Sequence, residues 1–423
     1  MTQLQIPYGK TTLTAHIPDR YNITQLIPAQ TDPAPDPIAA VEHALDHPQG
    51  GRGLDAFAGV KSVAIAVNDK TRPVPHQHLL PPLLNRLESM GIQPAQITLV
   101  IATGTHPVMP PAEYPLILPQ AIINRYPIVC HDATAAADLV HLGTTARGTP
   151  VWINRHYMAA DLRIVIGNVE PHQFMGFSGG VKSAAIGVAG KQTINHNHSM
   201  MTDESARLGQ YDGNPARADV EEIGRMIRVD FALNALLNGK KQIITALAGD
   251  PVAVMNAAIP QVRQIYTVTV DVPFDLMIVS PGGNPKDINV YQAQKGLAHA
   301  AMVAKPGGHV ILCAACPEGA GSETYETWVA ERGSHADVLQ AFAAEGFRVG
   351  PHKAFQIARD AANLNVQWVS EMDTAYAQKL LLNPATDLQS ALDAALANLP
   401  NDARIGVMTA ANATIPALRE GVS

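Results

Sequence analysis

The chain has 423 residues, which exceeds the usual size of one hydrophobic core and predicts two domains. Hydrophobic residues make up 47% of it, enough to fill such cores, so the composition excludes a disordered or disulfide-stapled chain. The formal net charge of −7, without a basic patch, argues against nucleic acid as the main partner. Small-molecule chemistry is therefore the favoured class of function.

The three cysteines, Cys130, Cys313 and Cys316, are too few for the disulfide framework of an extracellular protein, which favours the cytoplasm. The first ten residues lack the apolar core of a signal peptide, and no segment approaches the roughly 20 apolar residues that span a bilayer. Cys313 and Cys316 have a spacing that suits zinc or a redox pair, but no second pair accompanies them. We expect two small buried side chains there.

The first part of the chain alternates apolar runs with polar and helical segments. An N-terminal hairpin is expected first, then a proline-rich loop over 32–37, and a helical pattern runs from Pro82 to Met90. Four apolar runs each end in polar residues, and they cover 62–67, 97–102, 126–130 and 162–167. Such runs are typical of parallel strands buried on both faces, and ligands bind beyond the carboxyl ends of these strands.

The alternation starts again beyond about residue 270. A helical pattern covers 290–303, and the expected strands cover 276–279, 308–312, 366–370 and 405–408. The boundary is expected between Thr267 and Phe274, where the sequence is extended and contains a proline. The predicted fold class is α/β, with two Rossmann-like domains of mostly parallel sheet, residues 1–270 and 271–423. We expect the active site in the cleft between them.

The strongest indication of an active site is the stretch from Glu170 to Ser183, which reads EPHQFMGFSGGVKS. Its glycines let backbone N–H groups approach an anion closely, and Lys182 can neutralise that anion or act as a nucleophile. An ATP-binding P-loop is excluded because Val181 stands where the second glycine of that pattern must be. Two further histidines follow, His196 and His198.

Three more segments make the pattern specific. Residues 68–73 read NDKTRP, residues 102–107 read ATGTHP, and residues 289–296 read NVYQAQKG. Together with the glycine-rich stretch, these segments resemble the nickel-pincer-nucleotide-dependent lactate racemase family. The family pattern has Asp-x-Thr-Arg-Pro, Thr-Gly-x-His, and Glu-Pro-His-x-x-x-Gly-Phe-Ser-Gly-Gly-x-Lys in this order, and the likeness runs from about Lys61 to the chain end. The resemblance implies an isomerase, a racemase or epimerase of 2-hydroxy acids.

The resemblance also implies a cofactor, the nickel-pincer nucleotide (pyridinium-3-thioamide-5-thiocarboxylic acid mononucleotide) with Ni(II). Lys182 would carry it through a thioamide link, and separate maturation enzymes would make it. Because the cofactor supplies three metal donors, the chain supplies one, assigned to His198 by its distance from Lys182, with His196 as the alternative. The residues expected to contact the cofactor are Asp69, Thr71, Gly179 and Gly180.

On the substrate side, His106 and His172 are the expected acid–base pair. Inversion of a 2-hydroxy acid needs groups on both faces of C2, and the unperturbed histidine pKa lies near neutrality. Arg72 offers a planar fork for the substrate carboxylate, and Pro73 is expected to fix its turn. Gln292 and Lys295, which share a helical face, would complete that carboxylate site. The implied reaction is reversible hydride transfer from C2 to the cofactor.

Two alternatives stay open. One is a zinc-dependent hydrolase or lyase with His106, His172 and His198 as metal ligands, and the other is a cofactor-binding protein without turnover. The family often has an arginine after the histidine of Thr-Gly-x-His, where this chain has Pro107, so a 2-hydroxy acid other than lactate is as consistent with the sequence. Roles for His131, His196, His352 and Lys353 are not assigned.

Overall fold

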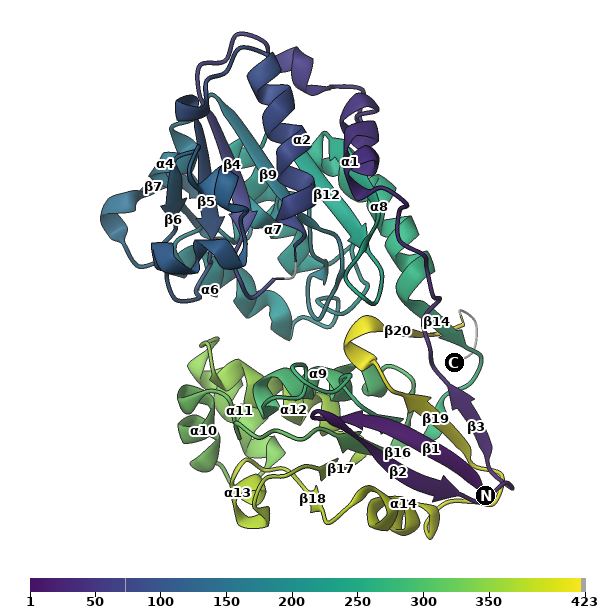
Figure 1. Ribbon diagram of the computed structural model, residues 1–423. Coiled ribbons are helices and arrows are strands. Elements are labelled where there is room, and N and C mark those ends of the chain that lie inside the picture. The colour runs from purple at the N-terminus through teal and green to yellow at the C-terminus, as the bar shows by residue number, and fades with distance from the viewer. Residues whose placement is uncertain (73, 420–423) are drawn as a thin grey trace. The chain divides into compact units, whose positions relative to one another are not determined.

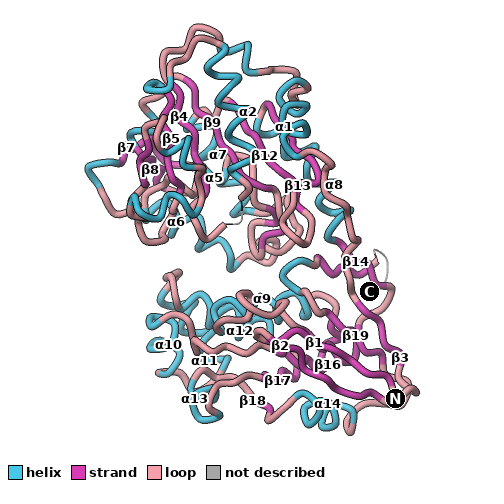
Figure 2. Tube along the Cα trace, viewed as in Figure 1, coloured by secondary structure: helices cyan, strands magenta, loops and turns pink. Residues whose placement is uncertain are grey.

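The computed structural model describes residues 1–72 and 74–419, so the prediction for Pro73 lies outside the described residues. The chain divides into two compact units, one formed by Gln30–Ile265 and the other by Met1–Ala29 together with the chain from Tyr266 onward. Figures 1 and 2 show that each unit combines a sheet with covering helices. The predicted α/β class with mostly parallel sheets is confirmed.

The sheet of the Gln30–Ile265 unit has six strands in the order β13-β12-β9-β4-β5-β6. All neighbours are parallel except β12 and β13. The four strands predicted from apolar runs are all present. The strands are β4 (Val63–Asn68), β5 (Ile97–Ala102), β6 (Ile128–Cys130), β9 (Leu162–Asn168), β12 (Phe231–Leu237) and β13 (Ile243–Gly249).

Helices cover both faces of this sheet, because alternate strand side chains point to opposite sides. Ile65 and Leu99 belong to the core packed by α1 (Pro37–Asp46) and α2 (His76–Ser89). The short helices α4 (Arg155–Met158) and α5 (Lys182–Ala185) contact the sheet as well. The remaining elements are α3 (Gln120–Ile123), the antiparallel pair β7 (Leu139–Thr144) and β8 (Pro150–Asn154), α6 (Lys191–Ser199), α7 (Pro215–Ile227) and α8 (Pro251–Tyr266).

The second unit is built on a fully parallel sheet in the order β18-β17-β16-β15-β19-β3. Met277 and Val279 point into the core under the helices α9 to α12, whereas Leu276 and Ile278 point toward α14 and the hairpin of β1 (Thr2–Tyr8) and β2 (Thr11–Ile17). The strands are β15 (Phe274–Val279), β16 (Ala304–Cys313), β17 (Asn365–Val369), β18 (Pro384–Ala385) and β19 (Arg404–Met408). The helices are α9 (Val290–Ala301), α10 (Glu323–Ala330), α11 (His335–Glu345), α12 (Pro351–Ala361), α13 (Thr374–Lys379) and α14 (Leu388–Leu396). A parallel pair, β14 (Thr267–Val270) and β20 (Ile415–Leu418), completes the unit.

The division of the chain differs from the predicted limits, 1–270 and 271–423, at the N-terminus. The strand β3 (Asn22–Gln25) pairs with β19 at the edge of the second sheet. The hairpin of β1 (Thr2–Tyr8) and β2 (Thr11–Ile17) buries its apolar side chains against the same sheet. The first 29 residues therefore belong with the C-terminal part of the chain. Pairing between opposite ends of a chain leaves no mark in a local hydrophobic pattern.

Cys313 and Cys316 are buried free thiols, as expected for two small side chains at the end of β16. Burial raises the pKa of the Cys313 thiol to about 12, so this thiol stays protonated at neutral pH.

Among the described residues, no helix has the length and apolar character needed to cross a bilayer.

Candidate active site

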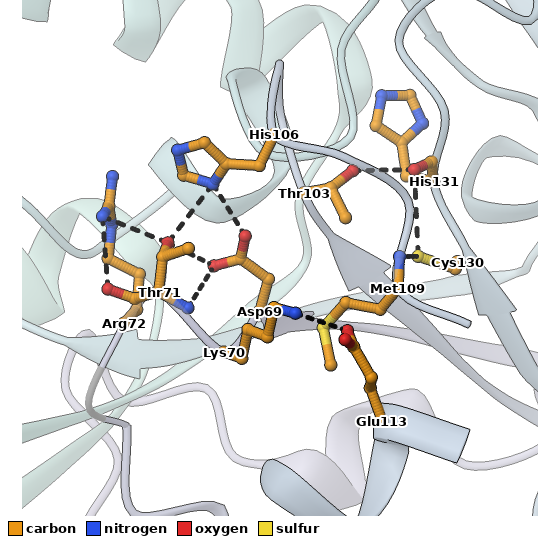
Figure 3. Close-up of polar contacts among 10 residues, drawn as sticks. All are labelled: Asp69, Lys70, Thr71, Arg72, Thr103, His106, Met109, Glu113, Cys130 and His131. Atoms are coloured by element: carbon orange, nitrogen blue, oxygen red, sulfur yellow. Dashed lines mark hydrogen bonds and ion pairs between the residues drawn. The ribbon is translucent and has the colours of Figure 1, made fainter. Parts of the chain in front are cut away.

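The residues after β4 form a turn around the carboxylate of Asp69, which is 2% exposed. Its Oδ1 accepts hydrogen bonds from the Thr71 backbone N–H at 3.2 Å and from the Thr71 hydroxyl at 2.7 Å. Its Oδ2 lies 2.7 Å from Nδ1 of His106, which follows β5 (Figure 3). An ionised Asp69 can only accept, so Nδ1 of His106 is the donor, and the neutral ring keeps Nε2 as an acceptor.

The pKa of Asp69 is set by opposing effects. Burial raises it, but the hydrogen bonds from His106 and Thr71 and the positive charge of Arg72 together bring it below its ordinary value. Arg72 also donates to the Thr71 hydroxyl at 3.3 Å. Asp69 is therefore a carboxylate at neutral pH. Asp69 and Thr71 contact each other and His106 here, and their contact with a cofactor stays a prediction.

The loop that carries His106 is anchored at two points. The Thr103 hydroxyl donates to the backbone oxygen of His131 at 2.7 Å, and the Gly104 N–H donates to the Gly187 oxygen at 2.9 Å. The His106 side chain is 38% exposed, so its ring can be reached by a small molecule. His131 is fully buried and bonded to the Ala189 oxygen at 2.9 Å, which gives it a structural role.

His172 lies in a short hairpin formed by β10 (Pro171–His172) and β11 (Gly176–Phe177). The Met175 backbone N–H donates to Nδ1 of His172 at 3.3 Å, so the neutral ring carries its proton on Nε2. The Phe174 ring stands edge-on to His172 at 4.9 Å between centroids, and edge-on to His198 at 5.0 Å. Phe174 therefore places these two histidines in one neighbourhood.

The glycine-rich turn before α5 needs glycine for steric reasons. Gly179 and Gly180 have positive φ angles, +83° and +57°, where other residues are strained. An added Cβ would lie 2.6 Å from a Val169 methyl at the first position and 2.6 Å from Met255 Cγ at the second. The Gly180 N–H donates to Asn234 Oδ1 at 2.8 Å. The structure explains both glycines by close packing, and their contact with a cofactor stays a prediction.

A buried arginine that the sequence motifs did not reveal supports this turn. Arg217, on α7, is 1% exposed and donates to the backbone oxygens of Phe177 and Gly179, each at 3.2 Å. Its guanidinium forms an ion pair with Glu221, in which Nη2 lies 2.6 Å from Oε1. The signal that could have identified it is an arginine on the buried face of an amphipathic helix, with a carboxylate four residues later.

Lys182 is the first residue of α5 and is half-buried. Burial, followed by the positive charges of Arg72 and Arg217, holds the pKa of its amine well below the ordinary value. A lysine in this environment has a larger fraction of neutral, nucleophilic amine than an exposed one. The positive charge of Arg72 therefore acts on both Asp69 and Lys182.

His198 and His196 point to different sides of α6, as a helical spacing of two requires. His198 is half-buried, with Nδ1 3.2 Å from Asn197 Oδ1. His196 instead lies 2.9 Å from the Thr149 hydroxyl, which belongs to a buried network with Asp219. His196 thus contributes to packing, while His198 stays the predicted metal ligand.

Across the described range, no three His, Cys, Asp or Glu side chains are grouped so that they could hold a metal ion. The zinc alternative needs three such donors from His106, His172 and His198, and they do not form such a group. A metal site that takes only one donor from the chain does not require such a group of three side chains.

Gln292 and Lys295 lie in the second unit, on α9. The Asn289 side chain caps this helix by accepting from the Gln292 N–H at 3.1 Å. The Lys295 ammonium donates to Gln292 Oε1 at 2.8 Å, and both side chains are half-buried. The predicted pair is therefore assembled on one helical face, and its contact with substrate stays a prediction.

Comparison with known proteins agrees with these motifs. Residues 8–209 match the family model described as the lactate racemase N-terminal domain, and residues 269–415 match the lactate racemase C-terminal domain. The lactate racemases of Thermoanaerobacterium thermosaccharolyticum and Lactiplantibacillus plantarum are each 31% identical over 418 residues. The alignments cover 96% of this chain and 97% and 98% of those proteins.

Solved structures show the same relationship. The lactate racemase apoprotein from T. thermosaccharolyticum superposes with a TM-score of 0.90 at 30% identity, and the match covers 99% of this chain and 100% of that one. A Thermotoga maritima protein at 18% identity shares the fold, with a TM-score of 0.68 over 92% of this chain and 100% of that one. The chain belongs to the lactate racemase family and is an isomerase.

Proposed function

We propose that this isomerase inverts the C2 centre of a 2-hydroxy acid, the class to which the lactate of its named relatives belongs. The observation that carries the proposal is the pair of histidines held in opposite tautomers. Nε2 of His106 is an acceptor because Asp69 occupies Nδ1, and Nε2 of His172 carries the proton because Nδ1 accepts from Met175. One ring can take a hydroxyl proton and the other can supply one.

The residues of the first unit fit a lysine-linked nickel-pincer nucleotide. Lys182 offers an amine of lowered pKa beside a tightly packed glycine turn, and His198 offers a half-buried imidazole, a borderline donor that suits Ni(II). When bound, this group would supply a reversible hydride acceptor for C2. Maturation enzymes that make the cofactor belong to the same proposal as partners.

The chain's own residues then have separate tasks. Arg72 binds the C1 carboxylate through its planar guanidinium, as the resemblance implies. His106 removes the hydroxyl proton from one enantiomer, while His172 returns a proton when the other enantiomer forms. In the reverse direction the two histidines exchange these tasks, because a racemase must act on both hands of its substrate.

The test uses protein produced together with the maturation enzymes. Chiral chromatography should detect conversion of one lactate or malate enantiomer into the other, and intact-mass spectrometry should show an added mass on Lys182. Lys182→Ala should lose both, whereas the matched control Lys191→Ala, at a nearby exposed lysine, should keep both. Activity in Lys182→Ala, or an adduct on another residue, would contradict the proposal.

The two alternatives predict other results. A zinc enzyme would retain activity without the maturation enzymes and lose it when zinc is removed. A cofactor-binding protein would carry the added mass but would not change the enantiomer ratio.

A further inference from the structure

A buried lysine lies in the first turn of α12. Lys353 is 5% exposed, its ammonium donates to Gln356 Oε1 at 2.9 Å, and it lies 4.8 Å from the centroid of the Tyr291 ring on α9. No carboxylate of the described residues forms an ion pair with it. A cation at a helix N-terminus opposes the helix dipole, and a buried charge without an ionic partner is costly. This environment favours an anion beside Lys353.

The negative charge of Asp360 acts on Lys353 and raises the pKa of its amine. Asp360 Oδ1 accepts from Arg359 Nε at 2.7 Å, and burial raises the pKa of the Asp360 carboxyl group. Asp360 therefore already has a cationic partner of its own. Burial and the charge of Lys295 both lower the pKa of Lys353 well below its ordinary value, so two ammonium groups influence each other here.

Gln356 provides a second, independent sign of a ligand. It is fully buried, its oxygen is used by Lys353, and its Nε2 is a buried donor without a partner within the described part of the chain. Buried donors are nearly always satisfied, so an orphan amide beside a cation indicates an acceptor that binds there. The helices α9 and α12 pack against each other, and Gln292 and Lys295 on α9 are half-buried.

We propose that Lys353 and Gln356, next to Lys295, form a subsite for a second carboxylate, so the preferred substrate is a 2-hydroxy dicarboxylic acid. This rests on the proposed function, in which Arg72 binds the C1 carboxylate, and on the expectation that Gln292 and Lys295 complete that carboxylate site. A methyl group, as in lactate, would leave the Lys353 ammonium without an anion and the Gln356 Nε2 donor without an acceptor. A site with buried polar groups discriminates strongly against a ligand that lacks the matching atoms.

Binding is measured by calorimetry on the full chain, with malate, succinate and lactate as probes. Malate should bind more tightly than lactate, and Lys353→Met should weaken malate binding by roughly 10- to 150-fold, as expected for a lost hydrogen bond to a charged group. Lactate binding should not weaken. Lys379→Met, at an exposed lysine of the same unit, is the control and should bind as the unmodified chain does.

A second variant keeps the test sharp if Lys353→Met folds poorly. Gln356→Glu would pair with Lys353 internally, so it should keep the fold and abolish the preference for malate. Equal binding of malate and lactate by the unmodified chain, or an unchanged preference in Gln356→Glu, would overturn the subsite. Racemisation of lactate with no preference for malate would refute only the subsite, whereas malate binding without racemisation of any 2-hydroxy acid would refute only the proposed function.

Discussion

The substitution Asp69→Asn changes one atom of the proposed site. Oδ1 of Asp69 accepts both hydrogen bonds from Thr71, and an asparagine oxygen keeps them. The oxygen that faces His106 becomes an NH₂ group, which donates and cannot accept from Nδ1. The neutral His106 ring must then carry its proton on Nε2, the atom that is proposed to remove the substrate proton.

Two estimates set the size of the effect. A positioned general base contributes about 10²- to 10⁴-fold to a rate. The hydrogen bond to an ionised group is worth about 1.5 to 3 kcal/mol, or roughly 10- to 150-fold. The ranges overlap near 10²-fold, and this is the expected loss of racemisation rate, measured from both enantiomers by chiral chromatography. Nitrogen NMR of His106 should show the proton move from Nδ1 to Nε2.

The chain contains a matched control. Asp132 forms the same turn, with its Oδ1 accepting from the Thr134 N–H at 2.8 Å and from the Thr134 hydroxyl at 2.7 Å, and it makes no ion pair with a histidine in the described structure. Asp132→Asn should therefore keep the full rate. A rate for Asp69→Asn that matches this control, or an unchanged His106 tautomer, would refute the reasoning.

Three further outcomes follow from the structure. Lys182 in the cofactor-free chain should reach half-maximal acetylation at a lower pH than exposed lysines, by peptide mass spectrometry, and an equal or higher pH would contradict its environment. Gly176→Ala should lower the unfolding temperature far more than Gly213→Ala, since only the first places Cβ 2.1 Å from a backbone oxygen, and equal losses would count against this packing. Burial lowers the pKa of His76 and His299 to about 4, so the unfolded chain binds more protons below pH 6.5. Stability to urea should fall by about 2 kcal/mol per histidine from pH 7 to pH 5, and a flat profile would contradict their burial.

The sequence predicted four strands of each sheet because parallel strands buried on both faces are continuous apolar runs. It did not predict β12 and β13 of the first sheet, or β3 and β18 of the second. The predicted and observed limits of helix α2 differ. The helix expected from Pro82 to Met90 extends from His76 to Ser89, and Pro81 and Pro82 lie inside it. The assignment of the first 29 residues depended on pairing between β3 and β19, which only the folded chain shows.

For the candidate site, the motifs predicted the residues but not the hydrogen bonds between them. Asp69 and His106 lie on different strand ends, and the contact between them arises from the adjacency of β4 and β5. Phe174 stands inside a recognised motif, yet its position between His172 and His198 depends on the hairpin fold. Arg217 was missed because a buried arginine is defined by the backbone oxygens that it meets, and these belong to another segment.

The central claim is inversion at C2 by transfer of hydride, and the most direct measurement uses enantiopure substrate with deuterium at C2. Cofactor-loaded protein in ordinary water should produce the opposite enantiomer with most of the label retained, because hydrogen that moves as hydride does not exchange with water. Absence of the opposite enantiomer would contradict the isomerase reaction. Formation of the enantiomer with its label lost to water would contradict hydride transfer.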